Sequence, residues 1–257
     1  MSDAFYVGAI GLETQQRALD GIANNIANVN TPAFKRAQLR FSDIVASRSA
    51  ADAATVDPTQ PTNTLAGVAL DTQFMLNETG EIQHTGQAMD LAIQGNGFIE
   101  LMGPDGQTLL WRGGAMRVND DGMLATAKGT ALRAAITVPR DATAFTIGSD
   151  GMVRATVPDS TDPVEVGQIQ LVRVDDPASV ERLDGGVYRV RDGSALAEAQ
   201  PGEDGVGTLV QGAVERSNVA LTDEMVQLML VQRAFAANAQ ILQAADQMMA
   251  IANGLRR

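Results

Sequence analysis

The sequence contains few side chains that could carry out chemistry. His84 is the only histidine, and the chain has no cysteine. Histidine triads, multi-histidine metal sites, thiolate nucleophiles and cysteine zinc sites are therefore excluded. We interpret His84 as an ordinary surface or turn residue.

Glycines and aspartates stand where they favour turns. Gly95-Asn96-Gly97 resembles part of a dinucleotide-binding fingerprint, but no further glycine and no helical pattern follow it. Acidic pairs could act as in glycosidases, or bind calcium at Asp120-Asp121 and Asp175-Asp176, yet several aspartates precede a glycine, as tight turns require. No EF-hand loop with a terminal glutamate is present. We predict no catalytic residue, no cofactor site and no metal site, and we do not expect an enzyme.

The charges are distributed unevenly along the chain. With 31 acidic and 19 basic residues, the formal net charge is −12, which disfavours nucleic acid as a partner. Residues 1–50 have 5 basic and 4 acidic residues, residues 212–257 have 4 of each, and residues 51–211 have 10 basic and 23 acidic. Neutral ends can pack against copies of themselves without repulsion, whereas the acidic middle suits a surface that faces water.

Neither a membrane span nor a secretory signal is expected. No stretch of about 18 apolar residues occurs. The first residues lack a basic leader, and Asp3, Glu13 and Asp20 interrupt any apolar region. We therefore expect that export would use a route without a cleavable signal.

The first 30 residues follow the spacing of a helix that packs along one stripe. Pro32 is expected to end this helix, because Thr31 before it is disfavoured in the helical region. The spacing of three and four residues is typical of a coiled coil. The stripe consists of Phe5, Leu12, Leu19, Ile22, Ile26 and Val29.

The last segment is predicted to be a helix with two apolar stripes. Asn218 or Thr222 could cap its start, and Gly254 suits its end. The first stripe is Leu221, Met225, Leu228, Phe235, Leu242 and Met249. The second stripe is Leu230, Ala234, Ala237, Ile241, Ala244, Met248, Ile251 and Leu255. At about 100° per residue, positions 228 and 230 lie on opposite sides of the helix. The N-terminal helix can cover one stripe, so the second stripe predicts contact with another chain.

Between the helices, short alternating apolar runs are separated by turn dipeptides. The runs are 91–93, 98–101, 145–147, 169–172 and 187–190, and Asp-Gly pairs begin at 105, 121, 150, 184 and 192. This pattern predicts an all-β domain. Residues 47–67 are rich in small and polar residues and favour a loop or arm.

The predicted fold class is α+β, with terminal helices packed as a coiled-coil-like domain and an all-β domain inserted between them. We assign residues 1–36 and 212–257 to the helical assembly domain, 37–74 to an extended arm or linker, and 75–211 to a β-rich outer domain.

Three stretches of the chain form recognisable motifs. The N-terminal motif contains Asn24, Asn25, Asn28, Asn30, Thr31, Phe34 and Lys35. The C-terminal motif contains Ser217, Asn218, Val219, Gln232 and Arg233, and the third motif is residues 91–98. These motifs resemble those of the bacterial flagellar basal-body rod and hook proteins, in which the third one opens the β domain. Residues 135–153 resemble the distal rod members most, with proximal rod and hook-type members as alternatives. Pro32-Ala33 departs from the distal pattern, which more often has Thr-Gly there.

The resemblance implies a structural subunit of the flagellar drive shaft. Such a subunit is exported through the flagellar type III apparatus and polymerises into a helical tube in the periplasm, which passes torque from motor to hook. Its partners would be identical copies, other rod proteins, the hook protein and the surrounding ring proteins, without nucleic acid. A different class remains open: a secreted β-rich binding protein or glycan-acting enzyme, in which the helices pair only with each other.

Overall fold

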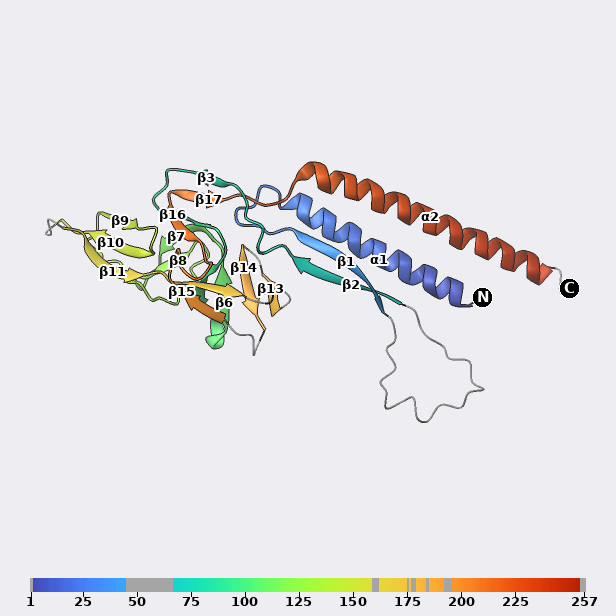
Figure 1. The fold of residues 1–257 in the computed structure, drawn as a ribbon, viewed down its shortest axis with the longest axis horizontal. Coiled ribbons are helices and arrows are strands. Elements are labelled where there is room, and N and C mark those ends of the chain that lie inside the picture. The colour runs from blue at the N-terminus through green and yellow to red at the C-terminus, as the bar shows by residue number, and fades with distance from the viewer. Residues whose placement is uncertain are drawn as a thin grey trace, which may run out of the picture. The chain divides into compact units, whose positions relative to one another are not determined.

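The computed structural model describes residues 2–44, 67–158, 162–174, 176, 179–183, 185–191 and 196–254 (Figure 1). The chain divides into two compact units. Unit 1 comprises Met1–Ile26, Ala37–Gln73 and Leu221–Arg257, and unit 2 comprises Ala27–Arg36 and Phe74–Ala220. Each unit is therefore built from segments that are far apart in the sequence.

Unit 1 contains the two helices, α1 (Ser2–Ala27) and α2 (Leu221–Gly254). They are in antiparallel contact, since Gly8 approaches Leu242, Gly11 approaches Asn238, and Asn25 bonds Glu224. A Cβ atom on Gly8 would lie 2.6 Å from Leu242 Cδ2, so glycine permits the close approach there. The first helix ends at Ala27, before the position that Pro32 suggested, and α2 extends to Gly254, the last described residue.

The most buried side of α1 differs from the stripe read from the sequence. Thr14, Ala18, Ile22 and Asn25 are buried. Of the predicted stripe, only Ile22 is among them. The other described members, Leu12, Leu19, Ile26 and Val29, are half-buried. The difference arises because small and polar residues occupy the line of closest contact, whereas a pattern of large apolar residues marks the neighbouring side of the helix.

Residues that were expected to form an extended arm contribute two strands to unit 1. They are β1 (Ala37–Ile44) and β2 (Gly67–Phe74), which pair as a two-stranded sheet. Residues 45–66, which hold most of the predicted loop at 47–67, lie outside the described residues.

Unit 2 is built from antiparallel sheets, as the alternating runs predicted. Its strands are β3 (Ile82–His84), β4 (Asp90–Gln94), β5 (Phe98–Met102), β6 (Thr108–Trp111), β7 (Gly113–Val118), β8 (Leu124–Thr126), β9 (Ala144–Ile147), β10 (Met152–Thr156), β11 (Val164–Gln168), β12 (Leu171–Val174), β13 (Val180–Arg182), β14 (Val187–Val190), β15 (Leu196–Ala199), β16 (Thr208–Gln211) and β17 (Ala213–Glu215). The strand orders are β13-β14-β6-β5-β12-β15, β16-β4-β7-β8, β11-β10-β9 and β17-β3. An inserted β region between terminal helices is thus confirmed.

The six-stranded sheet separates two apolar clusters. Successive residues of a strand point to opposite faces. Ile99 and Leu101 of β5 therefore join the large core with Trp111, while Phe98 packs with Tyr188 in a second cluster. The Phe98 and Tyr188 rings meet edge to face, with centroids 5.5 Å apart.

Asp-Gly turns connect the strands where the sequence predicted them. Gly122 lies between β7 and β8 with φ +81°, and Gly151 lies between β9 and β10 with φ +82°. Both conformations favour glycine, because a Cβ atom would be strained there. Asp184 and Asp192 lie outside the described residues. Among the described residues, no helix is long and apolar enough to cross a membrane.

Candidate assembly surface and buried junction

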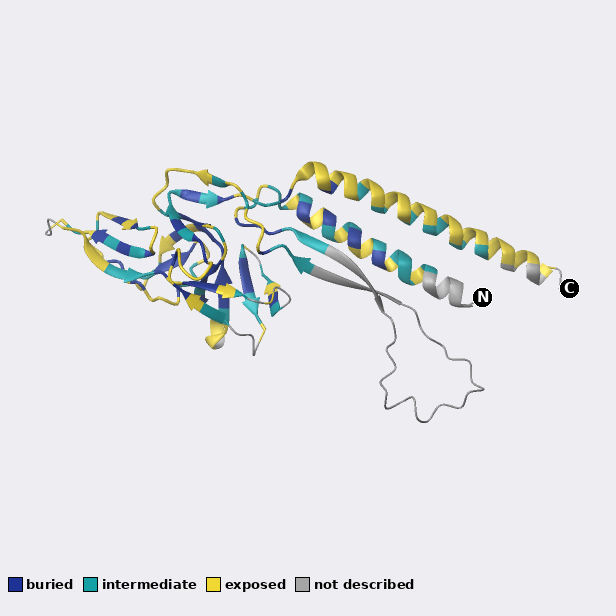
Figure 2. Ribbon diagram, in the orientation of Figure 1, coloured by how far each residue is buried: buried dark blue, intermediate teal, exposed yellow. Residues whose placement is uncertain are grey.

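One side of α2 is an uninterrupted row of exposed apolar side chains. Figure 2 shows α2 exposed over most of its surface. We name this row the uncovered stripe; its described members are Leu230, Ala234, Ala237, Ile241, Ala244, Met248 and Ile251. The four large side chains are 59–65% exposed. Leu255, the last residue of the row in the sequence, lies outside the described residues.

The opposite stripe of α2 is more buried between residues 228 and 242, although Leu221 and Met225 at its start are 44% and 51% exposed. Leu228, Phe235 and Leu242 are half-buried, and Leu242 contacts α1 at Gly8. Nothing is described of the side chains of Met249 and Phe5. The contrast agrees with the sequence argument that α1 can cover only one side of this helix.

The exposure of the uncovered stripe is energetically unfavourable. Fully burying a leucine, isoleucine or methionine side chain is worth roughly 1.5–3 kcal/mol relative to leaving it exposed. Large contiguous apolar patches are unusual on monomers and mark surfaces for other macromolecules or membranes. The stripe is thus suited to association through apolar contact.

Asn25, from the N-terminal motif, ties together three elements of unit 1. Its Oδ1 accepts a hydrogen bond from Ala37 N at 3.0 Å, and its Nδ2 donates to Ala37 O at 2.9 Å. The same Nδ2 lies 3.2 Å from Glu224 Oε2 in α2. The amide therefore pairs with the first residue of β1 as a neighbouring strand would, and it also holds the first turn of α2.

A cluster of buried charges in unit 2 includes Lys35 of the N-terminal motif. Lys35, Arg112 and Glu215 have side chains with no exposed surface. Glu215 Oε1 accepts hydrogen bonds from Lys35 Nζ at 2.6 Å and from Gly80 N at 2.7 Å. Glu215 Oε2 accepts from Arg112 Nε at 2.9 Å. We call these three charged residues the buried junction.

Further hydrogen bonds complete the buried junction. Lys35 Nζ also donates to Glu78 O at 2.6 Å, and Arg112 donates to the carbonyls of Gly95 and Gly97. The guanidinium of Arg112 therefore binds the Gly95-Asn96-Gly97 turn, which in the sequence resembled part of a dinucleotide-binding fingerprint. A Cβ atom on Gly95 would lie 2.7 Å from Gly207 Cα, which explains the need for glycine.

Both cations of the buried junction are removed from water, and Arg112 lies near an aromatic ring. The Arg112 guanidinium carbon lies 5.7 Å from the Phe98 ring centroid. Burial, with the nearby Arg112 charge, lowers the pKa of Lys35 from 10.5 to about 8, although Glu215 opposes this change. The carboxylate of Glu215 is therefore placed to balance two desolvated cations.

Asn218 of the C-terminal motif binds backbone groups instead of capping α2 with its side chain. Its Oδ1 accepts from Arg36 N at 2.7 Å, and its Nδ2 donates to the carbonyls of Met75 and Glu78 at 3.3 and 3.1 Å. Asn218 therefore does not act as the expected side-chain cap of α2. It links the backbone at Arg36 to the backbone at Met75 and Glu78.

The remaining motif residues are divided between the interior and the surface. Phe34 and Val219 are buried, and Asn28, Thr31 and Ser217 are half-buried. Asn24, Asn30, Gln232 and Arg233 are exposed. Sequence reasoning missed Arg112 and Glu215. The available signal was a charged residue directly after the apolar run Leu109-Leu110-Trp111, and that pattern is common at strand ends.

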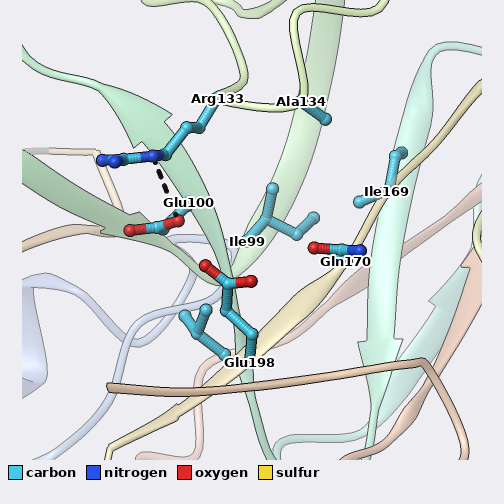
Figure 3. A pocket seen from close by; sticks show the side chains of 8 residues that line it. Ile99, Glu100, Arg133, Ala134, Ile169, Gln170 and Glu198 are labelled. Carbon is cyan, nitrogen blue, oxygen red and sulfur yellow. Dashed lines mark ion pairs between the residues drawn. The ribbon is translucent and has the colours of Figure 1, made fainter. Parts of the chain in front are cut away.

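Of the residues considered for chemistry, Asp120 and Asp121 are exposed, and Asp175 lies outside the described residues. His84 is exposed on β3. A cavity of about 180 Å³ brings Glu100 and Glu198 together, with Arg133 ion-paired to Glu100 at 3.5 Å (Figure 3). Burial raises the pKa of Glu100, and Glu198 adds to this effect. The cavity is smaller than the roughly 300–1,000 Å³ of ordinary ligand pockets.

Comparisons with known proteins place the chain in a family. Residues 5–35 match the family described as "Flagella basal body rod protein", 92–155 the "Flagellar hook protein FlgE/F/G D1 domain", and 210–255 the "Flagellar basal body rod FlgEFG protein C-terminal". The chain is 33% identical to flagellar basal-body rod protein FlgG of Borreliella burgdorferi over the whole of both chains. The chain belongs to the family of flagellar basal-body rod and hook proteins.

Two further members of this rod and hook family show its breadth. FlgG of Bacillus subtilis is 34% identical, again over the whole of both chains. FlgF of Caulobacter vibrioides is 33% identical over 94% of this chain and 93% of its own. Each of the three matched family segments contributes one charge to the buried junction: Lys35, Arg112 and Glu215 lie in the first, second and third segment respectively.

Proposed function

We propose that this chain is a structural subunit of the flagellar rod, which polymerises into a helical tube through its terminal helices. The uncovered stripe of α2 carries this proposal, because a row of large apolar side chains is exposed along a helix whose other side already contacts α1. Relatives that match over the full length are named rod proteins, which supports a structural role and not an enzymatic one.

A second copy of the chain is the occupant that best suits the uncovered stripe. Residues 212–257 have equal numbers of acidic and basic residues, so copies of α2 can approach without repulsion. The spacing of four and three residues matches the seam of paired helices. We propose that α1 and α2 pack as a coiled-coil-like unit and that the stripe is buried against a neighbouring subunit.

If the interface joins two different surfaces of the chain, each copy added to the polymer still has one of these surfaces available for the next copy. Such head-to-tail contacts build open helical filaments when the rotation between copies does not close a ring. A tube of this kind transmits torque because every subunit is held by more than one neighbour. The acidic residues 51–211 would then form the outer, water-facing layer.

Within the family, we propose the distal rod as the position of this subunit. Support comes from full-length similarity to FlgG proteins and from the length of the chain. The partners would be identical copies, other rod proteins, the hook protein and the ring proteins around the rod. The location would be the periplasmic part of the basal body, reached through the flagellar type III export apparatus.

Electron microscopy of basal bodies from cells that lack the gene tests this proposal. We expect rods that stop early and carry no hook, and we expect a plasmid copy to restore them. Basal bodies with complete rods and hooks in the deletion strain would contradict the rod assignment.

A further inference from the structure

The charges of the buried junction arrive in a fixed order along the chain. The two cations, Lys35 and Arg112, precede the carboxylate of Glu215, which stands at the end of β17. A ribosome makes the N-terminus first. For most of that time both cations are present while their shared partner is not.

A fold of unit 2 without Glu215 would bury two cations beside each other. Both side chains have no exposed surface in the folded chain. The side chains of Glu78, Arg182 and Tyr188 are the other titratable groups that act on this site. Glu78 is exposed, Arg182 adds positive charge, and burial raises the pKa of Tyr188, which keeps its hydroxyl neutral. None of them replaces a buried carboxylate, and removing one partner of a buried ion pair is strongly destabilising.

The four-stranded sheet β16-β4-β7-β8 also depends on residues that are synthesised late. β4 is almost wholly buried and lies between β7 and β16. Leu209 of β16 and Val206 before it belong to the large core. Without residues 206–215, β4 becomes an open edge with unpaired backbone groups, and the core that contains Leu91 and Ile93 loses Val206 and Leu209.

We propose that Glu215 is the closing group of unit 2: the two buried cations hold the emerging chain unfolded until this late carboxylate neutralises them. Unit 2 then folds in one step when nearly the whole chain has emerged. This inference concerns the order of folding and does not depend on the rod function.

Chains stalled on ribosomes at increasing lengths, ending with the full chain followed by a C-terminal linker, allow the proposal to be tested. Stalling soon after residue 215 leaves this residue inside the exit tunnel, and stalling at later positions releases it. We expect unit 2 to become resistant to protease in a single step, at the chain length that releases Glu215. Resistance of unit 2 while residue 215 is still in the tunnel would overturn the proposal.

Substitutions separate the carboxylate from the general need for β16. Glu215→Gln keeps the size of the side chain but removes its charge, and we expect the equilibrium constant for folding of unit 2 to fall on the order of 100-fold or more at the chain lengths that release residue 215. Lys35→Met leaves Arg112 and Glu215 as a balanced pair but removes the two hydrogen bonds of Lys35 Nζ, so we expect it to fold less well than the wild type and better than Glu215→Gln. Glu203→Gln, at an exposed position, is the matched control and should change nothing.

The double variant Lys35→Met/Glu215→Gln tests whether Glu215 acts through its charge. It again buries one net positive charge, as the wild type does, so we expect its equilibrium constant for folding to be at least tenfold higher than that of Glu215→Gln. A double variant that folds no better than Glu215→Gln would overturn the proposal, because the carboxylate would then act only through its hydrogen bonds.

Discussion

Replacing Ile241 tests the uncovered stripe without disturbing the monomer. Its side chain is 65% exposed, so the subunit itself loses little when the side chain changes. Full burial of an isoleucine is worth roughly 1.5–3 kcal/mol, and about two thirds of that remains to be gained on assembly, or about 1–2 kcal/mol. Ile241→Ala should therefore raise the critical concentration for polymerisation by about 5–30-fold.

Ile241→Asp should have a larger effect, because a carboxylate buried without a partner adds several kcal/mol of desolvation. We expect no polymer at concentrations where the wild type assembles. The assay is light scattering and sedimentation of the purified chain over a concentration series, with thermal unfolding followed by circular dichroism to confirm that the monomer is intact.

Met102→Asp is the matched control, since Met102 is a 51% exposed apolar residue of β5 in the other unit. We expect it to polymerise like the wild type. If Ile241→Asp assembles at the wild-type critical concentration, the uncovered stripe is not an interface and the reasoning fails. Under the alternative of helices that pair only within one chain, that is the result to expect.

Three other substitutions test the contacts inside the subunit. Asn25→Asp removes the donor to Ala37 O and places a second carboxylate beside Glu224, so unit 1 should lose roughly 2–4 kcal/mol, seen as earlier loss of helix in thermal circular dichroism; an unchanged melting curve would contradict this. The folded-state pKa of Lys35 is lowered to about 8, so the folded state releases its proton first and stability should rise between about pH 8 and 10.5. Over this pH range, the free energy of unfolding of the wild type in urea should rise by on the order of 3 kcal/mol relative to that of Lys35→Met. A difference between the two proteins that does not change with pH would refute burial as the cause of the lowered pKa. Gly8→Val should force Leu242 to move and should lower the stability of the helix pair by roughly 1–3 kcal/mol, whereas an unaffected melting temperature would show that the approach is not tight.

The strands and the second side of α2 could be predicted because their signals are local. Asp-Gly pairs at 121 and 150 select turns that only glycine adopts easily, and alternation on either side of them identifies strands. The stripe from Leu230 to Ile251 needs only the geometry of one helix. Neither inference requires knowledge of which residues meet across the fold.

The buried junction could not be predicted because its members are far apart in the sequence. Lys35 and Glu215 are separated by 180 positions, and a single lysine or glutamate looks like surface. The contact side of α1 was not predicted for a related reason. Gly8, Gly11 and Ala18 pack closely because they are small, and a search for large apolar residues at helical spacing does not detect small ones.

Labelling of a single cysteine on the uncovered stripe tests most directly whether this surface is buried in the rod. The chain has no cysteine, so Ala244→Cys introduces one thiol at a position that is exposed in the monomer. We expect a maleimide to label the monomer quickly, to leave intact basal bodies unlabelled, and to react again after the basal bodies are dissociated. Equal labelling of monomer and intact basal bodies would contradict the account.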